Sequence, residues 1–414
     1  MQKSRRDRLR AACKEGRIRA AAGWRIRRLL NLAASMRYFV RNPAAGRVAL
    51  LAPDYLPPDP EDEPLIDRLL RAYQRMKADQ DQVGALYQPS SLWQDQLDDA
   101  YRTLIDGAAR SDRAAFHFFL ANFGCWRDYT GIESSRAILA ADRNVLTRRH
   151  MEVDQFYRLL ATWTDLTQDP DIRRLSSPRH GNLAGALLDG QFVGLGSFFN
   201  SLYASAVLHL VDDRPRPVIA ELGAGYGKLA YFVLRDLNQF TYLDFDLPET
   251  LTVATYYLAK AFPDKRFLLY GEAPYSSQAH AEYDFILMPS WEMARLGESS
   301  VDLFLNKNSL GEMSREAVAN YVSLIVRSTR FFFHLNHDSI RNRYVDGSTS
   351  VLAREYPVPE EQFRLLWRYP DLGHQLYLPS AGATFDIFMY LYERRRDPVV
   401  TRQRGGALHS WPGA

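Results

Sequence analysis

The stretch Glu221-Leu-Gly-Ala-Gly-Tyr-Gly-Lys228 decides how this chain folds. A short apolar run typical of a buried strand, Pro217–Leu222, leads into it, and a helical pattern, Gly227–Leu237, continues from it. Glycines between a strand and a helix allow the backbone to turn tightly and a ligand to approach it closely. In open α/β sheets such turns lie at the carboxyl ends of the strands, where nucleotides bind. The stretch therefore predicts a loop that holds a nucleotide-type ligand.

Strand and helix patterns alternate beyond this loop. The strand patterns are 240–245, 266–270, 283–288, 302–305, 331–335 and 385–392, and the helical patterns among them are 248–261 and 314–328. This alternation predicts an α/β fold with a Rossmann-like, doubly wound, mostly parallel sheet over residues 196–393.

The spacing of the glycines separates three classes of ligand. A phosphate-binding P-loop needs G-x-x-x-x-G-K-[ST], but Leu222 and Leu229 occupy its two end positions. A dinucleotide loop needs G-x-G-x-x-G, and Lys228 stands where its third glycine belongs. The observed E-x-G-x-G-x-G is the first motif of class I S-adenosylmethionine-dependent methyltransferases, which predicts S-adenosyl-L-methionine as the cofactor. The residues expected to bind it here are Glu221, Gly223, Ala224, Gly225, Tyr226 and Gly227.

A second part of the cofactor site is expected at the end of the next strand. Asp246 lies there, 19 residues beyond Gly227, and a carboxylate in this place can accept hydrogen bonds from both ribose hydroxyls. Asp244 lies on the same strand face and is the alternative. Pro248 suits the first turn of the following helix, which favours Asp246, with Leu247 beside it, as the ribose ligand.

The adenine ring would lie against residues that follow the third strand of the sheet. Met288 and Pro289 suit an apolar wall there, and Trp291 could stack on the ring. Both 266–270 and 283–288 have the pattern of a strand, however, and the sequence leaves open which of them is the third strand.

Taken together, these motifs resemble a bacterial family of predicted sugar O-methyltransferases. The similar segments are Glu221–Gly227, Asp246–Leu251 and Asp302–Met313, and upstream Ser91–Trp93, Asn122-Phe123 and Thr130–Ser134. The resemblance covers about residues 90–393, and its most specific part is the Asn-Ser-Leu…Glu-Met block that ends at Met313. It implies methyl transfer to a sugar hydroxyl in surface polysaccharide or glycolipid biosynthesis, with a sugar or glycan as the acceptor.

Catalytic candidates follow the strand patterns 302–305 and 331–335. A sugar hydroxyl is a poor nucleophile, so a general base or a metal is expected to help remove its proton. Asn306 and Glu312 follow one strand and His337 follows the next. His337 has the intrinsic pKa of a base near neutral pH, while Glu312 could orient it, act as the base itself or bind a divalent metal. The alternatives are a solvated loop histidine and a glutamate that complements a helix dipole. The sequence allows a divalent metal but does not indicate one, and no Cys/His cluster has zinc spacing.

The rest of the chain divides into a basic arm, a helical part and a tail. Residues 1–50 carry 12 Arg and 2 Lys against Asp7 and Glu15, whereas the whole chain has a net charge of +3. Residues 60–195 are mainly helical and are expected to form a cap or substrate domain, and 394–414 are expected to be disordered. The two cysteines, Cys13 and Cys125, and the lack of a secretory signal favour a reducing cytoplasm, although a mitochondrial transit peptide would also be Arg-rich and acid-poor.

The arm contains a helical pattern. Apolar residues recur from Ala22 to Val40 at spacings of four, three, four, three and four. Two interpretations remain open: residues 17–41 contact an anionic membrane, or the helix docks on its own protein. No nucleic acid is expected as a partner, because few stacking aromatics beyond Trp24 and Tyr38 are interleaved with the basic residues.

Two other functions compete with methyl transfer. The first is an NAD-dependent sugar oxidoreductase or epimerase. Lys228 argues against it, because it stands in place of the third glycine of the dinucleotide motif. A Tyr-x-x-x-Lys pair is also lacking, since Ile325 stands four residues after Tyr321. The second is a non-catalytic binding protein with a methyltransferase fold. Intact Glu221 and Asp246 argue against that possibility.

Overall fold

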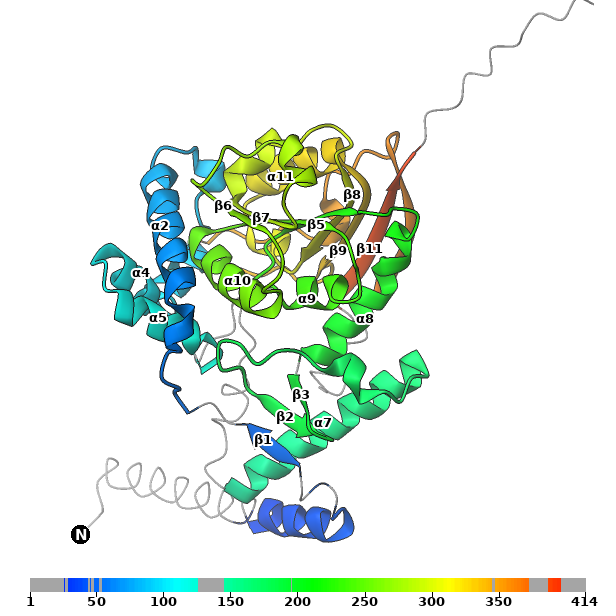
Figure 1. Ribbon diagram of the computed structural model, residues 1–414. Coiled ribbons are helices and arrows are strands. Elements are labelled where there is room, and N and C mark those ends of the chain that lie inside the picture. The colour runs from blue at the N-terminus through cyan, green and yellow to red at the C-terminus, as the bar shows by residue number, and fades with distance from the viewer. Residues whose placement is uncertain are drawn as a thin grey trace, which may run out of the picture.

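A computed structural model describes residues 26, 29–43, 45, 48–51, 54–125, 145–194, 196–344, 347–371 and 386–395. An eight-stranded sheet forms the upper body, and the N-terminal helices lie along one side of it and below it (Figure 1). Most of the basic arm, the segment Thr130–Ser134 and nearly all of the predicted tail lie outside the described residues. Within the described part of the chain, no helix combines the length and the apolar character needed to cross a membrane.

The large sheet has the order β10-β11-β9-β8-β4-β5-β7-β6. Six strands run parallel, namely β4 (Val218–Leu222), β5 (Thr241–Asp246), β6 (Phe267–Leu269), β7 (Phe285–Pro289), β8 (Val301–Lys307) and β9 (Thr329–His337). The strand β11 (Ile387–Arg394) is antiparallel to β9 on one side and to β10 (Phe363–Pro370) on the other. This is the Rossmann-like sheet of class I methyltransferases, so the predicted fold class is confirmed.

The order also identifies the third strand. Strand β7 pairs directly with β5, with Asp246 opposite Pro289, whereas β6 pairs only with β7 at the edge of the sheet. Of the two segments that the sequence left open, 283–288 therefore corresponds to the inner strand. Strand β10 was not predicted, because its residues are mostly exposed and a bulge between Leu365 and Trp367 breaks the alternation of apolar side chains.

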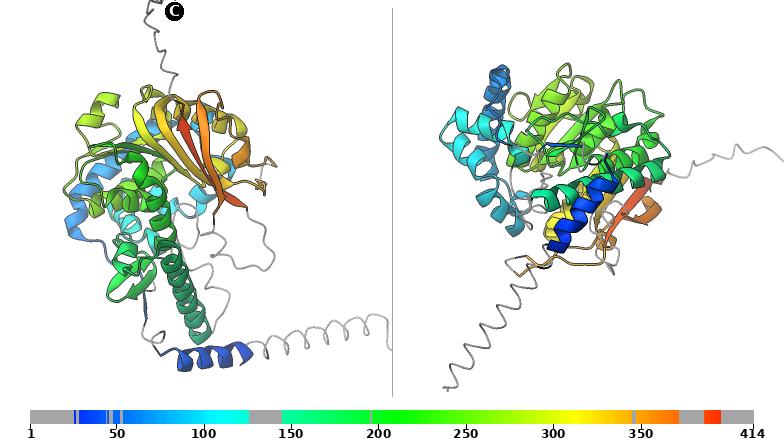
Figure 2. Two further views of the ribbon diagram at one scale, coloured as in Figure 1. Left: turned by 90° about the vertical axis from the view of Figure 1, so that its right-hand side faces the viewer. Right: turned by 90° about the horizontal axis from the view of Figure 1, so that it is seen from below.

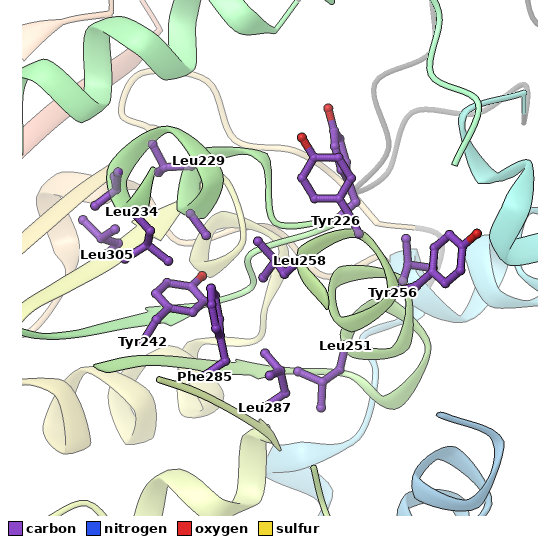
Figure 3. Packing of buried hydrophobic residues seen from close by; sticks show 14 of the residues in the cluster. Tyr226, Leu229, Leu234, Tyr242, Leu251, Tyr256, Leu258, Phe285, Leu287 and Leu305 are labelled. Atoms are coloured by element: carbon purple, nitrogen blue, oxygen red, sulfur yellow. The ribbon is translucent and has the colours of Figure 1, made fainter. Parts of the chain in front are cut away.

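Helices cover both faces of the sheet. On one face α8 (Ser197–Leu208), α9 (Lys228–Leu234) and α10 (Pro248–Ala261) pack on alternate strand residues such as Tyr242 and Phe285 (Figure 3). On the other face α11 (Arg315–Ser328) packs on the intervening residues, among them Leu243 and Phe304. Because both faces are covered, the inner strands are rich in apolar residues and most of their side chains are buried. A carboxylate on these strands is consequently buried and needs a specific explanation.

The N-terminal part is helical, as expected, but it also contains a small sheet. Its helices are α2 (Glu63–Gln80), α3 (Ser91–Asp99), α4 (Arg102–Ala109), α5 (Arg113–Ala121) and α7 (Val145–Thr167). Strand β1 (Ala49–Leu51) pairs with a hairpin formed by β2 (Gly185–Leu188) and β3 (Gln191–Gly194). The hairpin turn is Asp189-Gly190, with φ of 46° and 78°, the Asp-Gly signal of a tight two-residue turn that the prediction overlooked.

Short 3₁₀ turns connect these elements. They are η2 (Pro60–Asp62), η3 (Ala85–Tyr87), η4 (Phe123–Cys125), η5 (Ile172–Leu175), η6 (His209–Val211), η7 (Ser277–Ala281), η8 (Ser290–Arg295), η9 (Leu310–Glu312) and η10 (Ala353–Glu355). Turns η3, η8 and η9 matter for function, because each contributes residues to the cavity described next.

Candidate active site

A cavity of about 580 Å³ lies at the carboxyl ends of β4, β5 and β8. The glycine loop, residues 222–226, forms one part of its wall, together with Asp246 and Leu247. The segment 85–91 and Trp93 of the N-terminal part, and Glu312 and Tyr321 of the sheet domain, form another. The volume falls within the roughly 300–1,000 Å³ typical of small-molecule sites.

The glycine loop adopts a backbone that other residues rarely adopt. Gly223, Gly225 and Gly227 have φ of 76°, 63° and 86°, values in the left-handed region that favours glycine. A Cβ on Gly223 would lie 2.4 Å from Ser309 Oγ, and one on Gly227 would lie 2.9 Å from Leu258 Cγ. Each of these two glycines is thus required by a close approach as well as by its φ angle.

Of the two candidate ribose carboxylates, Asp246 lines the cavity and Asp244 does not. Asp246 Oδ1 accepts a hydrogen bond of 2.7 Å from the Leu247 amide, and Oδ2 accepts one of 3.3 Å from Gly225. Burial raises the pKa of Asp246 to about 6. Asp244 is completely buried, and burial and the neighbouring Asp246 raise its pKa well above the usual range.

Glu221 lies behind the loop and does not line the cavity. Its Oε2 accepts a hydrogen bond of 2.7 Å from the Tyr242 hydroxyl, while its buried Oε1 has no partner among the described residues. Burial raises the pKa of Glu221 to about 7. The structure therefore gives Glu221 a position beneath the loop, bonded to Tyr242 and outside the cavity lining.

Asn306 also lies behind the cavity, where it braces three strand ends. Its Nδ2 donates to the Leu222 carbonyl at 2.9 Å, and its Oδ1 accepts from Asn336 Nδ2 at 2.9 Å. Asn336 Oδ1 in turn accepts from the Gly311 amide at 3.1 Å. Through these bonds the ends of β4, β8 and β9 hold turn η9 in place. Asn306 was predicted to be catalytic, but its contacts are those of a residue that positions Glu312.

Glu312 faces the cavity at the end of turn η9. Its Oε2 accepts a hydrogen bond of 2.8 Å from the indole Nε1 of Trp93, on helix α3. Burial, with a smaller contribution from the charge of Asp246, raises the pKa of Glu312 to about 7, although the bond from Trp93 opposes this rise. The carboxylate does not bond to the amides of α11, which Ser314 caps instead. Glu312 is thus a cavity carboxylate that titrates near neutral pH.

His337 lies outside the cavity. It is the last residue of β9, and its Nδ1 lies 2.5 Å from Asp386 Oδ2. The ring lies close to turn η9, since a Cβ placed on Gly311 would be 3.9 Å from it, but His337 does not line the cavity. The sequence prediction that His337 is catalytic is not supported by this placement, and no pair of Glu312 and His337 forms.

The residues predicted to form the adenine wall do not line the cavity. Met288 points into the core between the sheet and α11, and neither Met288 nor Pro289 lines the cavity. The cavity wall at this point is Ser290, whose Oγ accepts a hydrogen bond of 2.9 Å from the Tyr321 hydroxyl. Trp291 makes an edge contact with Tyr270, 6.0 Å between ring centroids. Met288 and Pro289 thus lie outside the cavity lining, and their contact with adenine stays a prediction.

Several cavity residues were missed by sequence reasoning. Two lysines, Lys228 and Lys307, line the cavity near the glycine loop, and Lys307 Nζ donates to Asn200 Oδ1 at 3.3 Å. Tyr87 and Tyr321 make an edge contact with centroids 5.9 Å apart. The sequence pointed to Trp93 only through the family resemblance, which included the segment Ser91–Trp93. Among the described residues, no group of three or more His, Cys, Asp or Glu side chains is arranged to hold a metal ion.

Comparison with known proteins gives low similarity. No protein-family model matches the chain, and no curated protein sequence matches it. Among solved structures, a Pyrococcus horikoshii protein described as a candidate RNA methyltransferase is 14% identical, with 57% of this chain and 95% of that chain covered and a TM-score of 0.32. Mitomycin 7-O-methyltransferase is 12% identical (64% and 76% covered, TM-score 0.30). Geranyl diphosphate methyltransferase in complex with S-adenosylmethionine is 10% identical (47% and 85% covered, TM-score 0.33). These values are too low to support functional arguments, and the fold assignment is based on the strand order.

Proposed function

We propose that this chain is an S-adenosylmethionine-dependent O-methyltransferase that acts on a hydroxyl of a sugar or glycan. The observation that carries the proposal is a single cavity in which the glycine loop and Asp246 meet Glu312 and Trp93. One part has the features of a nucleoside cofactor site, and the other presents a base to an acceptor.

The charges of the cavity fit this cofactor. Asp246 and Glu312 line the cavity, Glu221 lies beneath it, and burial raises the pKa of all three carboxyl groups. A positive charge nearby stabilises the ionised form of each carboxyl group. Such a site favours a ligand with a sulfonium and an ammonium group, while Lys228 or Lys307 can pair with its carboxylate. The pyrophosphate of NAD would face the same carboxylates and is disfavoured. When bound, the cofactor supplies an electrophilic methyl carbon.

Glu312 is the general base in this proposal. An ionised Glu312 would accept the proton of the acceptor hydroxyl as that oxygen takes the methyl group, while the cofactor would leave as a neutral thioether. A pKa of about 7 places the carboxylate near the operating pH, where general bases are most effective. Trp93 orients the carboxylate, and Asn306 holds the turn from which Glu312 projects.

The acceptor is proposed to be a sugar on two grounds. Trp93, Tyr87 and Tyr321 line the cavity, and aromatic rings with polar tips suit the apolar C–H faces and hydroxyls of a sugar. The resemblance of residues 90–393 to sugar O-methyltransferases supports the same class. A role in surface polysaccharide or glycolipid biosynthesis follows from the resemblance alone.

Calorimetric titration tests the cofactor part of the proposal. The wild-type chain should bind S-adenosylhomocysteine and not NAD. Asp246→Ala should weaken binding by about tenfold or more, because two hydrogen bonds to a charged group are lost. Asp264→Ala removes an exposed carboxylate elsewhere and serves as the matched control, with unchanged affinity. Binding of NAD, or of neither ligand, would overturn the proposal.

A further inference from the structure

The N-terminal helix, residues 29–41, attaches to the rest of the chain along one side. Ser35 is fully buried, and its Oγ lies 3.0 Å from His150 Nδ1 on α7. The ring of Tyr38 lies over the same histidine with centroids 4.1 Å apart, and Phe39 makes an edge contact with it. These contacts hold the helix across the N-terminal end of α7, at the far end of the molecule from the large sheet (Figure 2).

The apolar face of this helix is not the side that docks. Its residues recur with helical spacing and are exposed, namely Ile26 (59%), Leu29 (66%), Ala33, Met36 (57%) and Val40 (79%). We call these five residues the exposed stripe. An amphipathic helix of a globular protein normally turns such a stripe toward its own core. Here the side that docks carries Ser35, Tyr38 and Phe39, so the stripe remains available to a partner.

The charge around the stripe defines the chemistry of that partner. Arg37 and Arg41 are exposed on the same helix. In the sequence, residues 16–53 contain eight arginines and neither Asp nor Glu. This surface combines apolar side chains with charges that are all positive. It matches the boundary of an anionic lipid bilayer, where headgroups pair with cations and acyl chains accept apolar groups.

We propose that the exposed stripe lies on an anionic lipid bilayer surface, with Arg37 and Arg41 at the headgroups. A second copy of the chain fits less well, because pairing two stripes brings like charges together. A nucleic acid would use the arginines but leave the stripe in water. The inference is independent of the proposed methyl transfer, and either can fail without the other.

Vesicle co-sedimentation of the full-length chain tests this inference. The wild type should sediment with phosphatidylcholine vesicles that contain phosphatidylglycerol and stay in solution with phosphatidylcholine alone. Met36→Ser/Val40→Ser should weaken partitioning at least tenfold, because each buried CH₂ contributes about fourfold. Arg37→Gln/Arg41→Gln should weaken it by about fivefold per arginine. Leu166→Ser, at an exposed leucine of α7, is the matched control and should bind as the wild type.

Three results would overturn the inference. The first is that the wild type does not sediment with anionic vesicles, and the second is that the stripe variant binds as well as the wild type. The third is a dimer, seen by analytical ultracentrifugation without lipid, that Met36→Ser/Val40→Ser dissociates, since the stripe would then be covered by a second copy. Unchanged thermal unfolding of the variants shows that the attachment to α7 is intact.

Discussion

Replacing Trp93 with phenylalanine should move the pH dependence of catalysis. The indole bond of 2.8 Å stabilises the ionised form of Glu312, so its loss raises the pKa of Glu312 above about 7. A hydrogen bond to a charged group contributes about 1.5–3 kcal/mol, and about 1.4 kcal/mol corresponds to one pKa unit. Because Trp93 and Glu312 are both half-buried, we take the lower end and expect a rise of about one unit.

The assay is a profile of kcat/KM against pH with a saturating cofactor. A base must be ionised, so the wild-type rate should rise with pH through about 7, and the Trp93→Phe rate through about 8. Above that pH the variant should recover toward the wild-type rate. Glu312→Gln should lose the rise of the rate with pH, and its rate should fall about 10²- to 10⁴-fold. If Trp93→Phe lowers the rate equally at every pH, the tryptophan only packs, and the rise with pH belongs to another group.

Three further predictions concern the loop and two histidines. Gly223→Ala should weaken S-adenosylhomocysteine binding by about tenfold, since φ of 76° and the contact with Ser309 both oppose a Cβ. The control is Gly190→Ala, which is also strained at φ of 78° but lies in open space, and it should keep wild-type affinity. An equal loss of affinity in both variants would contradict the reasoning. His337→Gln should retain most activity in the same kinetic assay, and a loss comparable to that of Glu312→Gln would restore the histidine as the base. Burial lowers the pKa of His334 to about 3. Below pH 6.5 the unfolded chain therefore takes up a proton at this histidine that the folded chain cannot accept. The free energy of unfolding consequently falls as the pH decreases from 6.5 toward 3. In urea unfolding at pH 7 and 5, His334→Phe should remove about 2 kcal/mol of this loss, and an identical loss in both proteins would show that other groups cause it.

The sequence predicted the parts of the site that local chain geometry determines. Helix α10 begins at Pro248 and ends at Ala261, as predicted, because proline fits the first turn of a helix. The glycine loop was located for a similar reason, since its left-handed backbone needs glycine. The contact between Trp93 and Glu312 joins residues 219 positions apart. No periodicity encodes such a pair, because tertiary packing alone brings α3 to turn η9.

His337 and Glu312 differ in their placement, and this difference is what makes Glu312 the proposed base. His337 was a candidate because free imidazole titrates near neutral pH, but it lies against Asp386 and does not line the cavity. Glu312 reaches a similar pKa through burial and the nearby charge of Asp246. Burial and a neighbouring carboxylate can therefore give a glutamate a pKa near that of free imidazole. The residue type alone does not identify a base, whereas its place in the cavity beside Trp93 does favour Glu312.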